Sequence, residues 1–345
     1  DLCDDGTLRL DQSYYKGTIV DQPNLYTSRL VTLLGGRVGQ RDNELDDWSI
    51  SVAKAMQLVS EEIATHFLRH LHRRTGLSQV VLGGGFFMNS VYNGKVLDQT
   101  PFKQAYISYA PSDVGNSIGA ALYVAHCIHD LERECSNNLS FIGPEFHHEE
   151  IVATLNRRKI AYRELASPEK TVAELIASGH IVAHFYGRME FGERALGNRS
   201  ILADPRDPEI KDRINSMIKY RESYRPFAPA VLSDKAHEYF DVNPECSSRF
   251  MESVVPVKAE YRASLPGVTH VDGSGRLQTV EAEENGRFYR IIKEVEALTG
   301  VPVVLNTSFN INGEPIVLSP DDALTTFFNS GLLYLVMDDV LVEKR

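Results

Sequence analysis

The sequence predicts an α/β fold in two domains, and three observations lead to this prediction. Short apolar runs typical of strands alternate with segments whose apolar residues recur at helical spacing. Glycine turns follow several of the apolar runs. The chain has 345 residues, 43% of them apolar, which is more than one hydrophobic core usually organises.

The first domain is predicted to alternate helices and strands. Asp46, Asp47 and Ser49 precede a helical apolar pattern that should end near Gly76. VVLGGG then reads as a strand entering a glycine turn, and a helical stretch follows over about 88–97. AYISYAP indicates a second strand, and SDVGNSIGAALYVAHCI a turn followed by a helix.

A domain boundary is predicted within residues 129–144, which are polar, carry no sustained period and end on Gly-Pro. We therefore divide the chain into residues 1–135 and 136–345. In the second domain, helices are expected in EEIVATLNRR, EKTVAELIAS, FYRIIKEVEALTG and 320–329. Strands are expected in KIAYREL, HIVAHFYG, VPVVLNTSFN and LLYLVMDD.

Composition argues against several classes of protein. No apolar run approaches the roughly 18 to 20 residues of a bilayer span, and the start lacks the basic flank and apolar run of a signal peptide, so we expect a cytoplasmic protein without membrane contact. A net charge of -11 would repel a phosphate backbone, so we expect no nucleic acid partner. An anionic small substrate must then be bound by local cations.

The cysteines and the first residue carry two further expectations. Cys3, Cys127, Cys135 and Cys246 are scattered without CxxC spacing, which favours reduced thiols over a zinc site or a disulfide framework. The chain begins with Asp rather than Met, so we expect that it can be a fragment of a longer protein.

Two glycine turns in the first domain indicate a nucleotide cleft. Gly84 and Gly85 sit where backbone amides can approach a phosphate, although a tight turn without a ligand has the same pattern. Asn89 could bond a ribose or a base, or simply cap a helix. Asp113, followed by glycines at the start of a helix, is a candidate metal ligand beside the phosphates.

Histidine pairs are weaker candidates for a metal site. His66 and His70 have the spacing of paired ligands on one helix face, but the segment is basic and has no neighbouring carboxylate. We therefore interpret them as part of a solvated helix face. His147 and His148, just before a helix, receive the same interpretation.

The second domain contains a dense group of cations. Nine Lys or Arg fall between residues 188 and 225, with seven acids interleaved, so individual placement rather than bulk charge should matter. Lys219 and Arg221 form a compact pair, and prolines fix the chain after Arg225. Any one of these cations could also form an ordinary surface ion pair. Together they suit the binding of phosphate or another oxyanion, to which arginine donates paired hydrogen bonds.

Two further stretches of the second domain complete this set. THVDGSGR is a glycine-containing turn that carries Arg276. NTSFN places Asn306, Ser308 and Asn310 at the end of a buried strand, which is where an open α/β sheet binds ligands.

These motifs resemble the carbamoyltransferases that modify nodulation factors, cephalosporins, aminocoumarins and aminoglycosides. The resembling segments, which span essentially the whole chain, are GGGFFMN, DVGNSIGAA, EFGERALGNRSILADPR, RPFAPAVL, THVDG and LNTSFNINGEPIV. The resemblance implies that residues 1–135 are the second lobe of an actin/hexokinase-type, Kae1-like domain. It implies that residues 136–345 are a YrdC-like α/β domain with a twisted mixed sheet.

In that family the YrdC-like domain makes carbamoyl adenylate from carbamoyl phosphate and ATP with Mg²⁺, and the Kae1-like domain transfers the carbamoyl group to a hydroxyl. Carried over by motif, the rear-domain residues that would bind carbamoyl phosphate and nucleotide are Arg194, Lys219, Arg225, Arg276, Ser308 and Asn310, and the first four are the catalytic candidates. Arg221 and Asn306 are further candidates for binding substrate or nucleotide. Lys219 with Arg221 resembles the KxR element of YrdC proteins, and Ser308 with Asn310 the SxN element. Gly84, Gly85 and Asn89 would lie near the nucleotide of the Kae1-like domain.

The resemblance also implies an iron-type metal, Fe²⁺, with Asp113 as one ligand. The family takes its other two ligands from an HxxxH pair in a first lobe that has no counterpart here, so that lobe or a subunit would be a partner. Phe87 stands where the family prefers a small residue, and Glu193 where it has a proline.

We therefore expect an ATP-dependent O-carbamoyltransferase acting on a hydroxyl of a sugar or natural product. A threonylcarbamoyl-adenylate enzyme of tRNA modification shares both folds and is one alternative. A non-catalytic nucleotide-binding subunit is the other.

Overall fold

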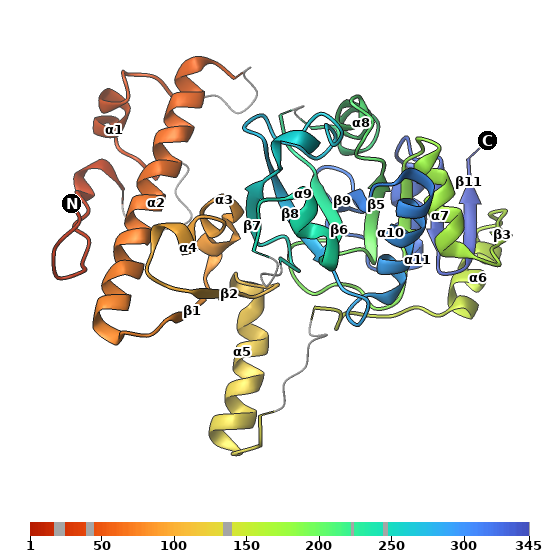
Figure 1. Ribbon diagram of the computed structural model, residues 1–345, viewed down its shortest axis with the longest axis horizontal. Coiled ribbons are helices and arrows are strands. Elements are labelled where there is room, and N and C mark those ends of the chain that lie inside the picture. Colours follow the sequence, from red (N-terminus) through yellow and green to blue (C-terminus); the bar gives the residue numbers. More distant parts are fainter. Residues whose placement is uncertain (17–24, 39–44, 134–139, 222–223, 244–247, 345) are drawn as a thin grey trace. The chain divides into compact units, whose positions relative to one another are not determined.

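The computed structural model describes residues 1–16, 25–38, 45–133, 140–221, 224–243 and 248–344 (Figure 1). It divides into two compact units, of which unit 1 comprises Asp1–Val81 and Lys95–Ala105, and unit 2 comprises Leu82–Gly94 and Tyr106–Arg345. The predicted boundary between residues 135 and 136 falls outside the described residues and stays a prediction.

Unit 1 is mainly helical, and its largest element is α2 (Asp47–Thr75). The predicted ends of this helix are confirmed. The carboxylate of Asp46 accepts a hydrogen bond from the backbone N–H of Ser49 at 2.8 Å, and Gly76 ends the helix in the left-handed region at φ 65°. The other helices of unit 1 are η1 (Gln12–Tyr14), α1 (Ser28–Leu33) and α4 (Val96–Gln99).

The chain passes between the units at a two-stranded sheet of β1 (Gln79–Leu82) and β2 (Gln104–Ile107), as the apolar runs predicted. The helix predicted over 88–97 is instead three short ones, η2 (Gly85–Met88), α3 (Ser90–Asn93) and α4. Asn89 is the reason for the first break, because it leaves the helical region (ψ 82°) and its side chain caps α3.

Unit 2 contains a nine-stranded mixed sheet in the order β3-β11-β10-β4-β5-β9-β6-β8-β7. Its strands are β3 (Arg163–Glu164), β4 (Val182–Phe185), β5 (Arg199–Ala203), β6 (Ala228–Leu232), β7 (Ser253–Pro256), β8 (Ser274–Val280), β9 (Val303–Ser308), β10 (Tyr334–Met337) and β11 (Val340–Glu343). The β10–β4 and β6–β8 pairs are parallel, and the other pairs are antiparallel. The α/β class and the mixed sheet are therefore confirmed.

Helices precede the strands of this sheet and alternate with them along the chain (Figure 1). They are α5 (Asn116–Tyr123), η4 (Val124–Ile128), α6 (His148–Arg157), α7 (Pro168–Ala177), α8 (Ile210–Ile214), η5 (Asn215–Lys219), α9 (Ala236–Tyr239), α10 (Gly286–Thr299) and α11 (Pro320–Phe328), with single turns η3 (Asp113–Gly115), η6 (Ser233–Lys235) and η7 (Ala259–Tyr261).

The strand alternation gives the sheet two apolar faces, each with its own core. Val182 and Leu202 belong to a cluster with residues of α7 and α10, whereas Ala183 and Ile201 belong to another with residues of α6, α8 and α11. Helices therefore cover both faces. The central strands β4, β5 and β6 are buried along their whole length, so their ends are held firmly.

The composition-based expectations have these outcomes. In the described part of the chain, no helix combines the length and the apolar character needed to cross a membrane. Cys3 and Cys127 are free thiols. Cys135 and Cys246 lie outside the described residues.

Candidate active site

Unit 2 contains a polar hollow of about 240 Å³ at the end of strand β9. Four guanidinium groups line it, and they come from the loop before β5, the loop before β6 and strand β8. The lining residues are Glu193, Arg194, Ala195, Arg221, Arg225, Pro226, Met251, Arg276, Asn306, Thr307 and Ser308.

Sheet register explains why these distant segments meet. Strand β9 lies between β5 and β6, with Ser308 opposite Ser200 and Asn306 opposite Ala228. Strand β8 is the next neighbour of β6. The last residues of β9 therefore lie beside the first residues of β5 and β6, and the loops that precede β5 and β6 meet there.

Arg194 and Arg276 neither donate a hydrogen bond nor form an ion pair in the described part of the chain, although Glu193 is a nearby opposite charge for Arg194. Burial lowers the pKa of Arg194. Burial, together with the nearby charges of Arg194 and Arg221, lowers the pKa of Arg276 to about 9. Like charges held together at a partly buried site are unfavourable unless an anion joins them.

The other lining charges leave this positive excess in place. Arg221 donates from Nε to Oδ1 of Asn215 at 2.9 Å, and its guanidinium lies 4.8 Å from the ring centroid of Phe227. Among the described residues, Glu193 is the one carboxylate that lines the hollow, and it accepts a hydrogen bond from the hydroxyl of Ser112. The hollow thus carries an excess of positive charge, which is complementary to an anion.

Lys219 is buried directly behind Ser308. Its Nζ lies 2.5 Å from the Ser308 carbonyl oxygen, 2.9 Å from the Asn310 carbonyl oxygen and 2.7 Å from Asn310 Oδ1. The Ser308 hydroxyl donates to the same Oδ1 at 2.6 Å. Burial and the charge of Arg221 lower the pKa of Lys219 to about 7. The ammonium therefore holds the end of β9 in place.

The structure thus brings together the eight residues predicted in the rear domain. Six of them line the hollow, and Lys219 and Asn310 support its wall. Their roles in binding or catalysis stay predictions.

The four residues predicted in the first domain do not line this hollow. Gly84 has a left-handed φ of 106°, and its N–H donates to the carbonyl of Pro111 at 2.6 Å, so that amide is already paired. Gly85 begins η2, and Asn89 caps α3 by accepting from the N–H of Tyr92 at 3.2 Å. Asp113 is exposed at the start of η3.

Sequence reasoning missed the residues that shape the loop carrying Arg194. Glu190 is buried, and its Oε1 accepts from the N–H groups of Leu196 (2.7 Å), Asn198 (2.8 Å) and Arg199 (3.3 Å). Asn285 donates to Oδ1 of Asn198 at 2.9 Å. The spacing of Glu190 ahead of a glycine-containing stretch was the available signal for such a role.

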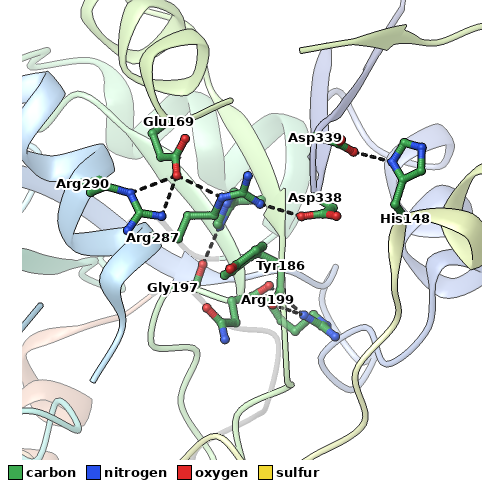
Figure 2. Close-up of polar contacts among 11 residues, drawn as sticks. His148, Glu169, Tyr186, Gly197, Arg199, Arg287, Arg290, Asp338 and Asp339 are labelled. Carbon is green, nitrogen blue, oxygen red and sulfur yellow. Dashed lines mark hydrogen bonds and ion pairs between the residues drawn. The ribbon is translucent and has the colours of Figure 1, made fainter. Parts of the chain in front are cut away.

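Figure 2 shows a second polar cluster, which includes Arg287, Glu169 and Asp338. Arg287 is 7% exposed; it pairs with Asp338 at 2.9 Å and Glu169 at 3.5 Å, and it lies 4.0 Å from the ring centroid of Tyr186. Arg199 donates to the Tyr186 carbonyl at 2.8 Å, so the cluster reaches the start of β5. Arg287 pairs with two carboxylates and Arg199 donates to backbone carbonyls, which indicates a structural role.

His148 belongs to this cluster rather than to a solvated helix face, so our interpretation of it was wrong. Its Nδ1 lies 2.5 Å from Oδ1 of Asp339, and the hydrogen bond between them raises the pKa of His148. Among the described residues, His148, Asp338 and Asp339 are the one group spaced to hold a metal ion. Asp338 is already paired with Arg287, and His148 with Asp339, so ion pairing explains the group.

Comparison with known proteins identifies the family of this chain. A model described as Carbamoyltransferase C-terminus matches residues 173–344, and one described as Carbamoyltransferase N-terminus matches residues 20–122. Together they cover well over half of the chain, so the chain belongs to the carbamoyltransferase family.

Two curated relatives illustrate the similarity. The chain is 36% identical to the protein sll1178 of Synechocystis over 373 aligned residues, which cover 100% of this chain and 60% of that protein. It is 41% identical to the nodulation protein NolNO of Sinorhizobium fredii over 303 residues, or 85% of this chain and 44% of that protein. The chain thus spans about half the length of the curated relatives it matches.

Among solved structures, the chain is similar to HypF, whose crystal structure is described as the phosphate- and nucleotide-bound form. The identity is 18%, the TM-score is 0.35, and the match covers 54% of this chain and 22% of HypF. A likeness at this level carries no argument about the site.

Proposed function

We propose that this chain forms carbamoyl adenylate from carbamoyl phosphate and ATP with Mg²⁺, as part of an O-carbamoyltransferase. One observation carries the proposal: Arg194 and Arg276 lie unpaired, beside Arg221 and Arg225, around one hollow in a member of the carbamoyltransferase family. Membership supports the carbamoyl donor, and the cation excess supports a triphosphate as the second ligand.

The chemistry of adenylation matches what this hollow offers. Water first cleaves carbamoyl phosphate to carbamate and inorganic phosphate. A carbamate oxygen then attacks the α-phosphorus of ATP, the bond to pyrophosphate breaks, and carbamoyl adenylate forms. Negative charge then has to be stabilised on both the transferred phosphoryl group and the leaving group. Arginine forks bind such oxyanions through paired hydrogen bonds, and Mg²⁺ would enter with the phosphates. The carbamoyl group would then pass to a hydroxyl of a small-molecule acceptor.

The fold assignment belongs to the same proposal. The nine-stranded mixed sheet supports a YrdC-like domain over 136–345, and residues 1–135 would be the second lobe of a Kae1-like domain. Asp113 joins no group of metal-ligating side chains among the described residues, so the other ligands of the iron site implied by the resemblance would have to come from another lobe or subunit. We derive no step through iron.

The test is pyrophosphate release by the chain with ATP, Mg²⁺ and carbamoyl phosphate. Arg276→Ala and Arg225→Ala are expected to lower the rate about 100-fold or more, because each removes a fixed cation from the transition state. Arg163→Ala is the matched control, since this exposed arginine of β3 pairs only loosely with Glu343 at 3.9 Å. Removal of Mg²⁺ by EDTA should stop the reaction.

Three other results would each change the proposal. An unchanged rate in Arg276→Ala would remove the hollow from the mechanism. Release that depends on threonine and bicarbonate would identify a threonylcarbamoyl-adenylate enzyme. Tight ATP binding with no pyrophosphate release would identify a non-catalytic nucleotide-binding subunit.

A further inference from the structure

Asn306 lines the hollow and has one polar atom without a partner. Its side chain is fully buried, at 0% exposure. Nδ2 donates to the carbonyl of Ala195 at 3.2 Å and to Oε1 of Gln278 at 2.7 Å. Oδ1 has no hydrogen-bond partner among the described residues. Because both N–H groups are engaged, Oδ1 is the only polar atom that Asn306 can offer to a ligand.

Neighbouring carbonyl groups fix the orientation of this amide. Gln278 donates from Nε2 to the carbonyl of Leu196 at 2.9 Å, which leaves its Oε1 as an acceptor toward Asn306. The carbonyl of Ala195 can also only accept. A flipped Asn306 would place Oδ1 against two acceptors, so the NH₂ group must face them. The unpaired oxygen is therefore set by the surrounding protein.

A buried acceptor without a donor is unfavourable, and a ligand N–H or O–H would remove the penalty. The four arginines of the lining supply cations, which donate hydrogen bonds and cannot accept them. The hollow thus offers two kinds of recognition. Arginines suit an oxyanion, and Asn306 suits a hydrogen-bond donor attached to it.

We infer that Asn306 is a specificity-determining residue that selects an acyl phosphate whose acyl group carries NH₂. This inference rests on the proposed function and deepens it. A carbamoyl NH₂ would donate to Oδ1. The methyl group of an acetyl phosphate has nearly the same size but cannot donate, so Oδ1 would stay buried and unpaired.

The test uses two stable analogues that differ only at this position. Phosphonoacetamide carries NH₂ where acetonylphosphonate carries CH₃, and the affinity of the wild-type chain for each is measured by titration calorimetry. We expect phosphonoacetamide to bind about tenfold more tightly or better, as one buried hydrogen bond provides. Equal affinities would overturn the inference and leave the proposed function standing. Failure of both compounds to bind would overturn both.

A pair of variants locates the preference. Asn306→Ala is expected to reduce the ratio of the two affinities toward one, while affinity for inorganic phosphate changes less than about threefold. Thr307→Ala, at the next lining residue, should keep the ratio. A full preference retained in Asn306→Ala would contradict the role of Asn306. Should Asn306→Ala fail to fold, Asn306→Val, which suits a strand and also lacks the amide oxygen, is measured in its place.

Discussion

Lys219 and Arg276 are both buried cations, but they differ in whether the protein supplies hydrogen-bond partners for them. The Lys219 ammonium is surrounded by oxygens of Ser308 and Asn310, so the protein itself satisfies it. Arg276 has no such partners in the described structure, and two other arginines lower its pKa. A satisfied cation holds structure, whereas an unsatisfied one is available to a ligand.

Replacing Lys219 tests the first of these roles. Lys219→Met keeps the length of the side chain but leaves the carbonyls of Ser308 and Asn310 without their donor. We expect the free energy of unfolding to fall by about 2 kcal/mol and pyrophosphate release to fall with it. Chemical denaturation monitored by fluorescence measures the first quantity.

Lys211→Met is the control for that experiment. Lys211 is partly buried in the same unit and donates to one carbonyl, that of Thr269, at 2.6 Å. It does not line the hollow, so its loss should affect stability only slightly and leave pyrophosphate release unchanged. Equal effects of the two substitutions would argue against a special role for Lys219.

At this scale the sequence predicted the cations but not their supports. Arginine and lysine within recognisable motifs can be identified from residue type and order, and the structure gathers them. Glu190 could not be identified in this way, because its partners are backbone N–H groups that only the folded loop brings together. The unpaired oxygen of Asn306 likewise depends on Gln278, 28 residues away.

Among the elements of unit 2, helix α10 is connected to the candidate site by its N-cap residue, Asn285. Asn285 accepts from the N–H of Phe288 at 3.1 Å and so caps the helix. Its Nδ2 donates to Oδ1 of Asn198, in the loop that Glu190 organises. The start of α10 and the loop before β5 are therefore one connected structure.

Two capping residues allow this connection to be tested. Asn285→Ala and Ser319→Ala each remove an N-cap, of α10 and α11 respectively, and each should lower stability by about 1 kcal/mol. Only Asn285→Ala is expected to weaken ligand binding in the hollow as well, because the hydroxyl of Ser319 bonds to Asp322 within its own helix. Melting temperatures and phosphate affinities of both variants distinguish the two effects. Equal losses of affinity would show that the link is not specific.

The elements themselves were predicted unevenly from the sequence. Helices such as α2 and α10 have long apolar periods and strong end signals, and they lie where expected. Strands β5 and β6 were overlooked because they lie in stretches that had been interpreted as ligand motifs. The antiparallel strand β11 was also missed, since its apolar run follows β10 after only two residues.

Across the whole molecule, buried titratable groups give stability a dependence on pH. Burial raises the pKa of Glu252 to about 7 and lowers the pKa of His184 to about 3. The two act in opposite directions. The contribution of Glu252 is present below its unfolded pKa and is lost as pH rises through 7. The contribution of His184 is present above pH 6.5 and is lost as pH falls.

Glu252→Gln should remove the part of the pH dependence of stability that comes from ionisation of Glu252. The amide keeps the shape of the protonated carboxyl and cannot ionise, so the variant should gain stability over wild type as the pH rises. Between pH 5.5 and 8 the difference in unfolding free energy should grow by about 1 to 2 kcal/mol, after allowance for solvent screening. Urea denaturation at the two pH values measures it. A difference that does not change with pH would show that Glu252 ionises normally.

The hollow is assembled from segments that are far apart in the chain, around residues 194, 221, 276 and 306. No short piece of the chain can therefore hold the ligand, and any opening of the central strands releases it. Ligand binding is thus coupled to the folding of unit 2. At a ligand concentration 100 times its dissociation constant, the coupling adds about 2.7 kcal/mol to the unfolding free energy. The substrate itself would then act as a stabiliser of the fold that binds it.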